Sequence, residues 1–326
     1  MTGNTVLDPA AYKNLPATLL VDGLLFPEGP VVMPDGSLLV CEIMGQRITH
    51  VRQCADGTWE KELWAEVPGG PNGAALAGDG SVYVCNNGGS FTWLERGGIR
   101  VPGPLPSTWT GGRIERIDPA TKQVTELYRT STSADGSPVS LRGPNDLVLD
   151  GHGGMWFTDH GVRTERTSDR TGIHYALLDG SSCREVIFPV SEPNGIGLTP
   201  DGDRLWWAET HTGRIYSREI TGPGQVGTPG PLNGLSAGLS GMRLLDSLAV
   251  DADGNACIGT LIDSGITVCS LSGETVTMKL PDEFRDPLVT NICFGGHDLR
   301  TAFITLSGTG RLVSVPWPVA GAILCG

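Results

Sequence analysis

Short apolar runs separated by turns rich in Asp and Gly recur along the chain. Six segments share one layout, in which an apolar run, a turn and a second apolar run follow one another, and this is the pattern of a β-hairpin. The first polar residues of the six segments, called the ring residues below, are Glu28, Asn72, Asn145, Asn194, Asp246 and Asn291. The chain as a whole therefore predicts an all-β protein.

The distance from each ring residue to its hairpin turn is the same in all six segments. It is seven residues in each case, and the residues found at this offset are Asp35, Asp79, His152, Asp201, Asp253 and Asp298. An offset repeated six times indicates an internal structural repeat. The turn residues are expected at the far end of each hairpin, with a structural role.

The spacing between segments predicts the architecture. Successive ring residues are 44, 73, 49, 52 and 45 residues apart, and all but the second value match the length of a four-stranded propeller blade. We predict a six-bladed β-propeller in one domain over residues 1–326, with a loop insertion around 91–141. The alternative is a β-sandwich with coincidental spacing. The apolar segment 17–25 is expected to pair with the last blade and close the ring.

The ring residues are expected to converge at one mouth of the central channel if each first strand is innermost. Asn or Asp before Gly is a common turn residue, which explains any one of them singly. Six oxygen-bearing side chains, with Glu28 and Asp246 as carboxylates, indicate a shared site instead. Carboxylate and amide oxygens without His or Cys favour a hard cation, Ca²⁺ first, with Mg²⁺, Mn²⁺ and Zn²⁺ as alternatives.

The second strand of each hairpin returns to the same mouth, so its last residues are expected to border the pocket. These rim candidates are Glu42, Met44, Asn86, Asn87, Asp159, His160, Thr210, His211, Asp263 and Ser307. His160 and His211 are either acid–base groups or polar rim residues. Asp146 follows a ring residue directly, and it is either close to the site or a turn residue at a strand start.

Aromatic residues occur both in the insertion and in one strand. Phe91, Trp93 and Trp109 lie in the insertion, where they form an apolar lid or pack the loop onto the propeller. Trp206 and Trp207 are adjacent in a strand and face opposite sides, which predicts core packing.

Composition and charge exclude several classes. The 326 residues include 47 Gly and 23 Pro, which suits many tight turns, and the net charge of −13 opposes binding to nucleic acid or to an anionic membrane. There is no run of 18 apolar residues and no secretory signal pattern. We therefore expect a cytoplasmic protein with reduced cysteines, of which Cys41, Cys85, Cys257 and Cys293 lie in apolar runs and act as small buried hydrophobes.

One motif points elsewhere. Residues 234–238 match the G-x-S-x-G pattern of a serine hydrolase. A nucleophile elbow needs a strand before it and a helix after it, whereas this match lies in a Gly-rich stretch between blades. We therefore do not expect a serine hydrolase.

Several segments resemble one known family. Glu28-Gly29-Pro30, Pro144-Asn145-Asp146, Pro193-Asn194-Gly195 and Asp246-Ser247 resemble the metal-site segments of the SMP-30/gluconolactonase/luciferin-regenerating-enzyme family. Residues 83–89 and the ending Thr290-Asn291…Phe294-Gly295-Gly296 are similar to its bacterial members, and the resemblance covers roughly residues 18–318. It differs at Ser247, where the family often has Gly, and at Gly143, where some sugar lactonases carry Arg.

The resemblance implies a six-bladed propeller that holds one divalent metal through Glu28, Asn145, Asn194 and Asp246. Family members typically hydrolyse lactones, and relatives cleave organophosphates. In a metal-dependent lactonase, Asp246 is the general base or a direct nucleophile. The residues expected to contact substrate are Asn72, Asn86, Asp146, His160, His211 and Asn291. The alternatives are a phosphotriesterase and a non-catalytic binding platform; no nucleic-acid or membrane partner is expected, and the oligomeric state is left open.

Overall fold

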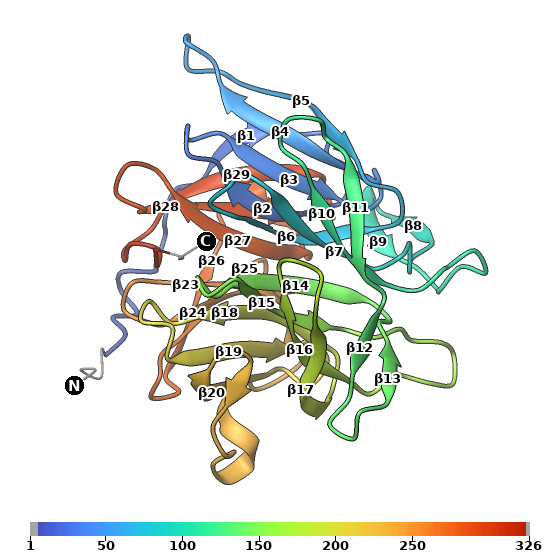
Figure 1. Ribbon diagram of the computed structural model, residues 1–326. Coiled ribbons are helices and arrows are strands. Elements are labelled where there is room, and N and C mark those ends of the chain that lie inside the picture. Colours follow the sequence, from blue (N-terminus) through green and yellow to red (C-terminus); the bar gives the residue numbers. More distant parts are fainter. Residues whose placement is uncertain (1–5, 324–326) are drawn as a thin grey trace.

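A computed structural model describes residues 6–323. Its strands form six sheets and one separate hairpin, and the sheets are arranged around a common centre (Figure 1). The predicted six-bladed β-propeller is thereby confirmed. Two short 3₁₀ turns, η1 (Pro231–Gly234) and η2 (Asp282–Phe284), are the only helical elements within residues 6–323.

In the first three blades the four main strands follow one another along the chain from the innermost strand outward. In blade 3, two short strands, β12 and β13, extend the outer edge beyond β17. From the inside outward, blade 1 contains β2 (Pro27–Val32), β3 (Leu38–Glu42), β4 (Arg47–Gln53) and β5 (Trp59–Glu66); blade 2 contains β6 (Pro71–Leu76), β7 (Val82–Asn86), β10 (Arg113–Ile117) and β11 (Val124–Tyr128); blade 3 contains β14 (Pro144–Leu149), β15 (Gly154–Asp159), β16 (Thr171–Leu177), β17 (Cys183–Val190), β12 (Thr130–Thr132) and β13 (Pro138–Ser140).

The last three blades follow the same order. Blade 4 contains β18 (Pro193–Leu198), β19 (Arg204–Glu209), β20 (Arg214–Gly222), β21 (Gln225–Val226) and β22 (Leu235–Gly238); blade 5 contains β23 (Leu244–Val250), β24 (Ala256–Leu261), β25 (Gly265–Cys269) and β26 (Thr275–Lys279); blade 6 contains β27 (Val289–Gly295), β28 (Thr301–Leu306), β29 (Arg311–Pro316) and β1 (Thr18–Val21).

The ring is closed by the N-terminal strand. β1 pairs antiparallel with β29, with Thr18 opposite Ser314, so blade 6 combines strands from both ends of the chain. The predicted pairing of segment 17–25 with the last blade is confirmed. Each innermost strand also contacts the innermost strands of both neighbouring blades, which leaves a central channel bordered by six strands.

The hydrophobic core is divided among the gaps between blades. Six buried clusters each join residues of two adjacent blades, and successive residues of a second strand enter different clusters, such as Leu38 and Leu39 in β3. Both faces of these strands are buried, which explains why they are continuous apolar runs. Trp206 and Trp207 are almost fully buried in two different clusters, which confirms their core role.

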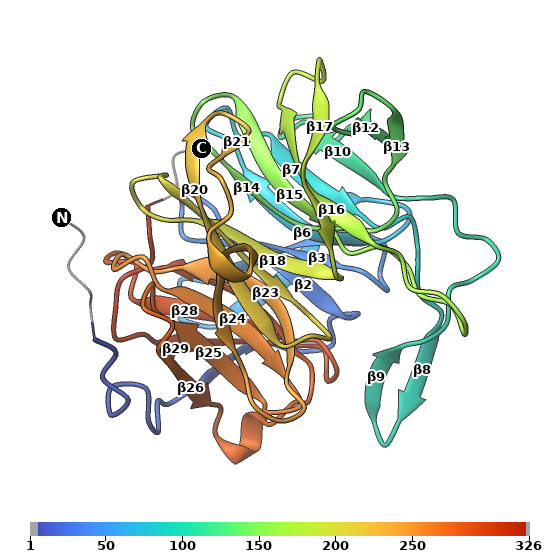
Figure 2. The same cartoon turned by 90° about the horizontal axis from the view of Figure 1, so that it is seen from below.

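Residues 91–141 contain regular structure. The hairpin formed by β8 (Trp93–Arg96) and β9 (Ile99–Pro102) is inserted between the second and third strands of blade 2, and it stands out from the six sheets at the right in Figure 2. β10 and β11 complete blade 2, and β12 and β13 border blade 3. Because β7 runs toward the mouth of the channel, the β8–β9 hairpin begins and ends beside that mouth.

Candidate metal centre and active-site cavity

The six innermost strands share an irregularity at the ring residues. In each one the register with the second strand shifts at this point, for example between Glu28 and Val31 in β2 and between Leu245 and Leu248 in β23. A β-bulge of this kind adds a residue to one strand and redirects its side chains. The repeated bulge therefore places neighbouring side chains in different parts of the channel.

The bulges gather five ring residues in one cavity at the channel mouth, called the mouth cavity below. This cavity has a volume of about 430 Å³, and the ring residues that line it are Glu28, Asn72, Asn145, Asn194 and Asp246. All five side chains are buried. The sixth ring residue, Asn291, donates from Nδ2 to Glu28 Oε2 at 3.1 Å. Residues up to 263 positions apart thus meet at one point.

The two carboxylates of the mouth cavity lack a basic partner. None of the ion pairs among residues 6–323 involves Glu28 or Asp246. Burial raises the pKa of Glu28 to about 7. Burial and the nearby Glu28 raise the pKa of Asp246 well above its usual range. Two acidic groups held together in a buried site without a cation resist ionisation, so a bound dication would relieve this cost.

Two amide oxygens of the same cavity are also without partners. Asn145 Oδ1 and Asn72 Oδ1 are buried acceptors that receive no hydrogen bond. Asn194 Oδ1 accepts only from Ser247 Oγ, at 3.3 Å, while its Nδ2 donates to Thr210 Oγ1 at 3.1 Å. A buried acceptor without a donor is costly, and a cation satisfies it. The donor set therefore fits a hard divalent cation.

This donor set is not a conventional acidic cluster. Within residues 6–323 no three His, Cys, Asp or Glu side chains gather in a metal-binding arrangement, because three of the five ring residues that line the cavity are amides. Amide and carboxylate oxygens are characteristic of calcium shells. Ser247, where the resembling family often has Gly, contributes its hydroxyl to Asn194 and its backbone N–H to Asp246 Oδ1 at 3.1 Å.

A polar cluster forms one wall of the mouth cavity. His160, Arg163 and His211 all line it, and the His160 and His211 rings lie 6.4 Å apart. Glu192 Oε2 lies 2.6 Å from His211 Nδ1, and its Oε1 lies 3.2 Å from Arg163 Nε. Although burial opposes it, the hydrogen bonds from His211 and Ser168 bring the pKa of Glu192 down to about 2. Glu192 is therefore ionised at physiological pH, and its contact with Nδ1 holds the His211 ring in one orientation.

Glu192 and Arg163 were not predicted from the sequence. Glu192 has a left-handed backbone with φ of 50°, which is uncommon for a residue with a side chain. The only sequence feature that could have indicated Glu192 as a site residue is its position directly before Pro193-Asn194. Burial lowers the pKa of His160 to about 4, so this ring is neutral at physiological pH.

Four of the ten rim candidates, Asn87, His160, Thr210 and His211, line the mouth cavity, and the other six do not. The residue opposite each strand-initial Pro, such as Glu42 opposite Pro27 and Asp159 opposite Pro144, turns away from the cavity. It accepts hydrogen bonds from the loop before the innermost strand: Glu42 from Leu25 N, Asn86 from Gly70 N, Asp159 from Arg142 N and Gly143 N, and Glu209 from Ser191 N. In these four blades the next residue lines the cavity; these residues are Ile43, Asn87, His160 and Thr210, of which only Ile43 was not among the rim candidates.

Asn86 is therefore a structural residue. Its side chain is fully buried and bonds Gly70, Gly88, Pro68 and Glu115. The other rim candidates outside the cavity are Glu42, Met44, Asp159, Asp263 and Ser307. Asp263 forms an ion pair with Arg243, and Ser307 donates to the carbonyl oxygen of Pro27.

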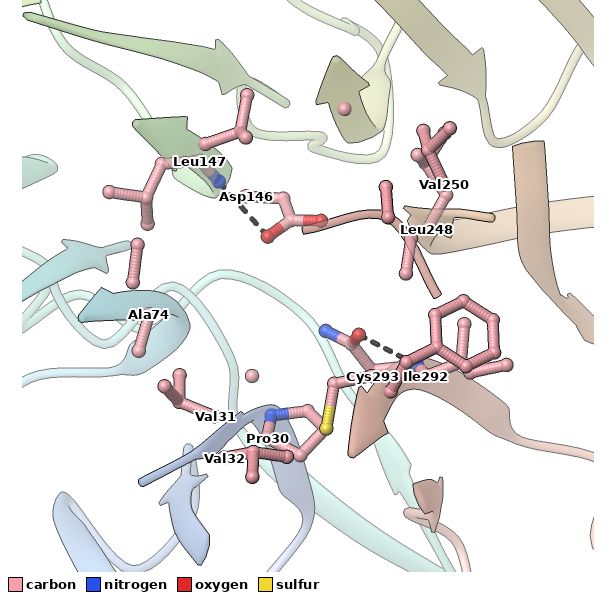
Figure 3. A pocket seen from close by; sticks show the side chains of 18 of the residues that line it. Pro30, Val31, Val32, Ala74, Asp146, Leu147, Leu248, Val250, Ile292 and Cys293 are labelled. Carbon is pink, nitrogen blue, oxygen red and sulfur yellow. Dashed lines mark hydrogen bonds between the residues drawn. The ribbon is translucent and has the colours of Figure 1, made fainter. Parts of the chain in front are cut away.

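Asp146 and Asn291 line a second cavity on the opposite side of the ring, called the far cavity below. It has a volume of about 380 Å³ and is bordered mainly by aliphatic side chains, with Asp146 facing its interior (Figure 3). Burial, and secondarily the charge of Glu28, raise the pKa of Asp146 to about 7. Since Asn145 lines the mouth cavity and Asp146 the far cavity, the bulge in β14 separates two adjacent polar residues. The prediction that Asp146 and Asn291 contact substrate in the mouth cavity is therefore wrong: both line the far cavity, and Asn291 instead holds Glu28 by its hydrogen bond.

The aromatic residues of the insertion pack in different ways. Phe91 lines the mouth cavity, and Trp93 lies between Phe91 and Phe26 with ring centroids 6.0 and 4.9 Å away. Trp109 donates from Nε1 to Asn87 O at 2.9 Å and carries the Arg142 guanidinium 4.5 Å above its ring. The insertion therefore both covers part of the mouth and packs onto the propeller.

The structure also places the G-x-S-x-G match and the cysteines, and its helices can be compared with the length of a membrane span. The G-x-S-x-G match lies in β22, an edge strand with no helix after it, and Ser236 Oγ bonds only Ser217 Oγ, so it is not a nucleophile elbow. Seven cysteines within residues 6–323 are free thiols; Cys41, Cys85 and Cys257 are fully buried, and Cys293 is half-buried. Cys325 lies outside the described residues. No helix in this part of the chain is long and apolar enough to cross a membrane.

The fold and the site define a β-propeller with an oxygen-lined centre at one channel mouth. Residues 26–308 match the family described as the SMP-30/Gluconolactonase/LRE-like region, and the chain belongs to this family. The resemblance drawn from Glu28, Asn145, Asn194 and Asp246 is thereby confirmed.

Relatives with a stated activity are similar over most of the chain. Lactonase drp35 of Staphylococcus saprophyticus is 26% identical over 298 residues, which cover 90% of this chain and 78% of that protein. Among solved structures, the gluconolactonase of Xanthomonas campestris has a TM-score of 0.69 at 20% identity and covers 93% of this chain and 89% of its own. The calcium-binding protein regucalcin of Agrobacterium tumefaciens has a TM-score of 0.71 at 14% identity, covering 96% and 97%. These two structures share the propeller fold.

Proposed function

We propose that the protein is a divalent-cation-dependent hydrolase that opens lactones. The observation that carries the proposal is the mouth cavity, where two buried carboxylates without an ion-pair partner and two unpartnered amide oxygens line one space. The lactonases among the relatives support the reaction. Glu28, Asn145, Asn194 and Asp246 would hold the cation, for which Ca²⁺ is the first choice.

The residues of the mouth cavity have different roles in the proposed reaction. The cation held by Glu28, Asn145, Asn194 and Asp246 would supply Lewis-acid chemistry, which means polarisation of a lactone carbonyl and stabilisation of the negative charge that develops on its oxygen. Asp246 accepts the proton of the attacking water as general base. Glu28 is held in place by Gly29 N at 3.2 Å and Asn291 Nδ2 at 3.1 Å. His211, oriented by Glu192, is placed to bind the substrate beside the reacting group.

The direct test is hydrolysis of a lactone panel with and without chelator. We expect wild-type protein with Ca²⁺ to open lactones, to fall to the uncatalysed rate after exhaustive chelation, and to recover when Ca²⁺ is restored. Phosphotriesters assayed in parallel test the alternative, a phosphotriesterase, and we expect no turnover of them. Full lactonase activity after chelation would contradict the cation dependence, and a lack of turnover on every lactone would contradict the proposed reaction.

The effect of Ca²⁺ on stability is expected to depend on pH. Without a cation, the raised pKa values of Glu28, Asp146 and Asp246 mean that the folded protein binds protons more tightly than the unfolded chain. Its stability therefore falls as pH rises from about 4 through about 7. Cation binding needs the ionised carboxylates, and at a hundredfold excess over Kd it stabilises by about 2.7 kcal/mol.

The increase in Tm caused by Ca²⁺ should therefore be larger at pH 8 than at pH 5.5. Thermal denaturation at fixed Ca²⁺ and ionic strength measures it, with K⁺ as the control cation. An equal increase at both pH values would argue against carboxylate ligands.

A further inference from the structure

The walls of the mouth cavity point to the class of lactone that it takes. Around the cation site, side chains from different blades and from the insertion present hydrocarbon surfaces: Phe26, Ile43, Phe91, Leu105, Val162 and Leu261. We propose that the substrates are lactones that carry an apolar alkyl or aryl substituent, rather than polyhydroxylated sugar lactones. The inference rests on the proposed lactonase function.

The polar groups of the cavity are mostly engaged with one another. Arg163 pairs with Glu192, and Thr210 Oγ1 accepts the hydrogen bond of Asn194. Thr290 Oγ1 lies 2.9 Å from Thr305 Oγ1. The oxygens of Glu28, Asn145, Asn194 and Asp246 belong to the proposed cation site.

The groups that remain for hydroxyls of a substrate come from blades 2 to 4, whereas blade 1, the insertion and blade 5 present only hydrocarbon side chains to the cavity beside the cation site. Asn87 Oδ1 accepts from Gly89 N and Ser90 N, at 2.9 and 3.1 Å, which leaves its Nδ2 as a buried donor without a partner. Asn72 Oδ1, which receives no hydrogen bond, His160, the outward nitrogen of His211 and the terminal nitrogens of Arg163 complete the set. A sugar lactone carries several hydroxyl groups, each a donor and an acceptor. Against hydrocarbon walls most of them would lose hydrogen bonds to water without replacement, which disfavours binding.

The insertion supplies part of the apolar wall and is fixed in position. Phe91 and Leu105 flank the β8–β9 hairpin and line the cavity. The hairpin reaches across to blades 1 and 6, where Arg100 Nη1 donates to Leu24 O at 3.0 Å and Arg100 N donates to Gly308 O at 2.9 Å. Since Arg142 is held by Asp169 at 2.9 Å and lies on Trp109, it does not bring a cation to this wall. An apolar substituent can therefore lie against the insertion without meeting an unpaired charge.

The test compares substrates on the wild-type protein at saturating Ca²⁺. A series of δ-lactones with lengthening alkyl chains is assayed beside D-glucono-δ-lactone. We expect kcat/KM to rise about fourfold per added methylene until the chain fills the cavity, and every long-chain lactone to exceed gluconolactone.

A pair of variants on the insertion locates the contact. Leu105→Ala removes part of the cavity wall, whereas Leu94→Ala removes an equal side chain from the exposed face of β8 outside the cavity. We expect the ratio of kcat/KM for the long-chain lactone to that for the unsubstituted lactone to fall about tenfold in Leu105→Ala. The ratio should stay at the wild-type value in Leu94→Ala, and Tm values check that both variants fold.

The outcomes separate the two proposals. Preference for gluconolactone over every alkyl lactone, or equal ratios in the two variants, overturns the apolar substrate class and leaves the lactonase function intact. Absence of hydrolysis with both substrate classes overturns the lactonase function itself, and the inference with it.

Discussion

Replacing Asp246 by Asn should lower kcat by about 10²–10⁴, the usual contribution of general acid–base catalysis, while Ca²⁺ remains bound. The amide keeps an oxygen that can coordinate the cation but cannot accept the proton of water. Asp246 is buried in the mouth cavity and receives the backbone N–H of Ser247 at 3.1 Å, so an isosteric Asn preserves the shape of the site. Lactone hydrolysis and isothermal titration with Ca²⁺ measure the two effects separately.

The matched control for this variant lies in the same blade. Asp253 is at the hairpin turn between β23 and β24, at the end remote from the mouth cavity. Asp253→Asn should leave kcat and Ca²⁺ affinity unchanged. If saturating Ca²⁺ returned Asp246→Asn to near wild-type turnover, Asp246 would be a ligand only and not the base.

Replacing Glu28 by Gln should remove Ca²⁺ binding and turnover together. Gln keeps the size of the side chain but removes one of the two charges that balance a dication. Disturbing even the groups that orient a metal ligand typically costs 10–100-fold in affinity or activity, so the loss of a charged ligand should weaken Ca²⁺ binding by at least about 100-fold. Asn291, which donates to Glu28 Oε2, can still hold the Gln oxygen, so the fold should be retained.

The control is Glu62→Gln on the exposed face of blade 1, where the Glu62 side chain is 62% exposed. It removes the same charge without touching the cavity, so Ca²⁺ affinity and kcat should match the wild type. Loss of turnover in Glu28→Gln with undiminished Ca²⁺ affinity would show that Glu28 acts on the substrate rather than on the cation.

The six hairpins and the gathering of the ring residues could both be predicted from the sequence. The seven-residue offset from Glu28 to Asp35 and its five counterparts predicted six hairpins, and all six are present as the first two strands of a blade. The reason is local: each hairpin needs an Asx-type turn, and its second strand needs apolar residues on both faces. The convergence of five of the six ring residues in the mouth cavity followed from the propeller symmetry, whereas Asn291 lines the far cavity.

The sequence did not predict which of two adjacent side chains faces the channel. Asn86 and Asn87 are adjacent and alike in chemistry, yet Asn86 bonds the loop before β6 and Asn87 lines the cavity. Period-two alternation predicts opposite directions for the pair, but it does not say which residue faces the channel. That depends on how β7 and the loop before β6 meet across the blade.

The sequence by itself determined the six-bladed architecture, its closure by segment 17–25 and the set of oxygen-bearing residues at one mouth, because these depend on periodic patterns that every blade repeats. Only the tertiary structure decided that a bulge sends Asn145 to the mouth cavity and Asp146 to the far cavity. It also decided that Glu192 orients His211 and that the insertion supplies an apolar wall. These features depend on register shifts and on contacts between blades distant in sequence, and a local pattern of residues does not encode the direction of such contacts.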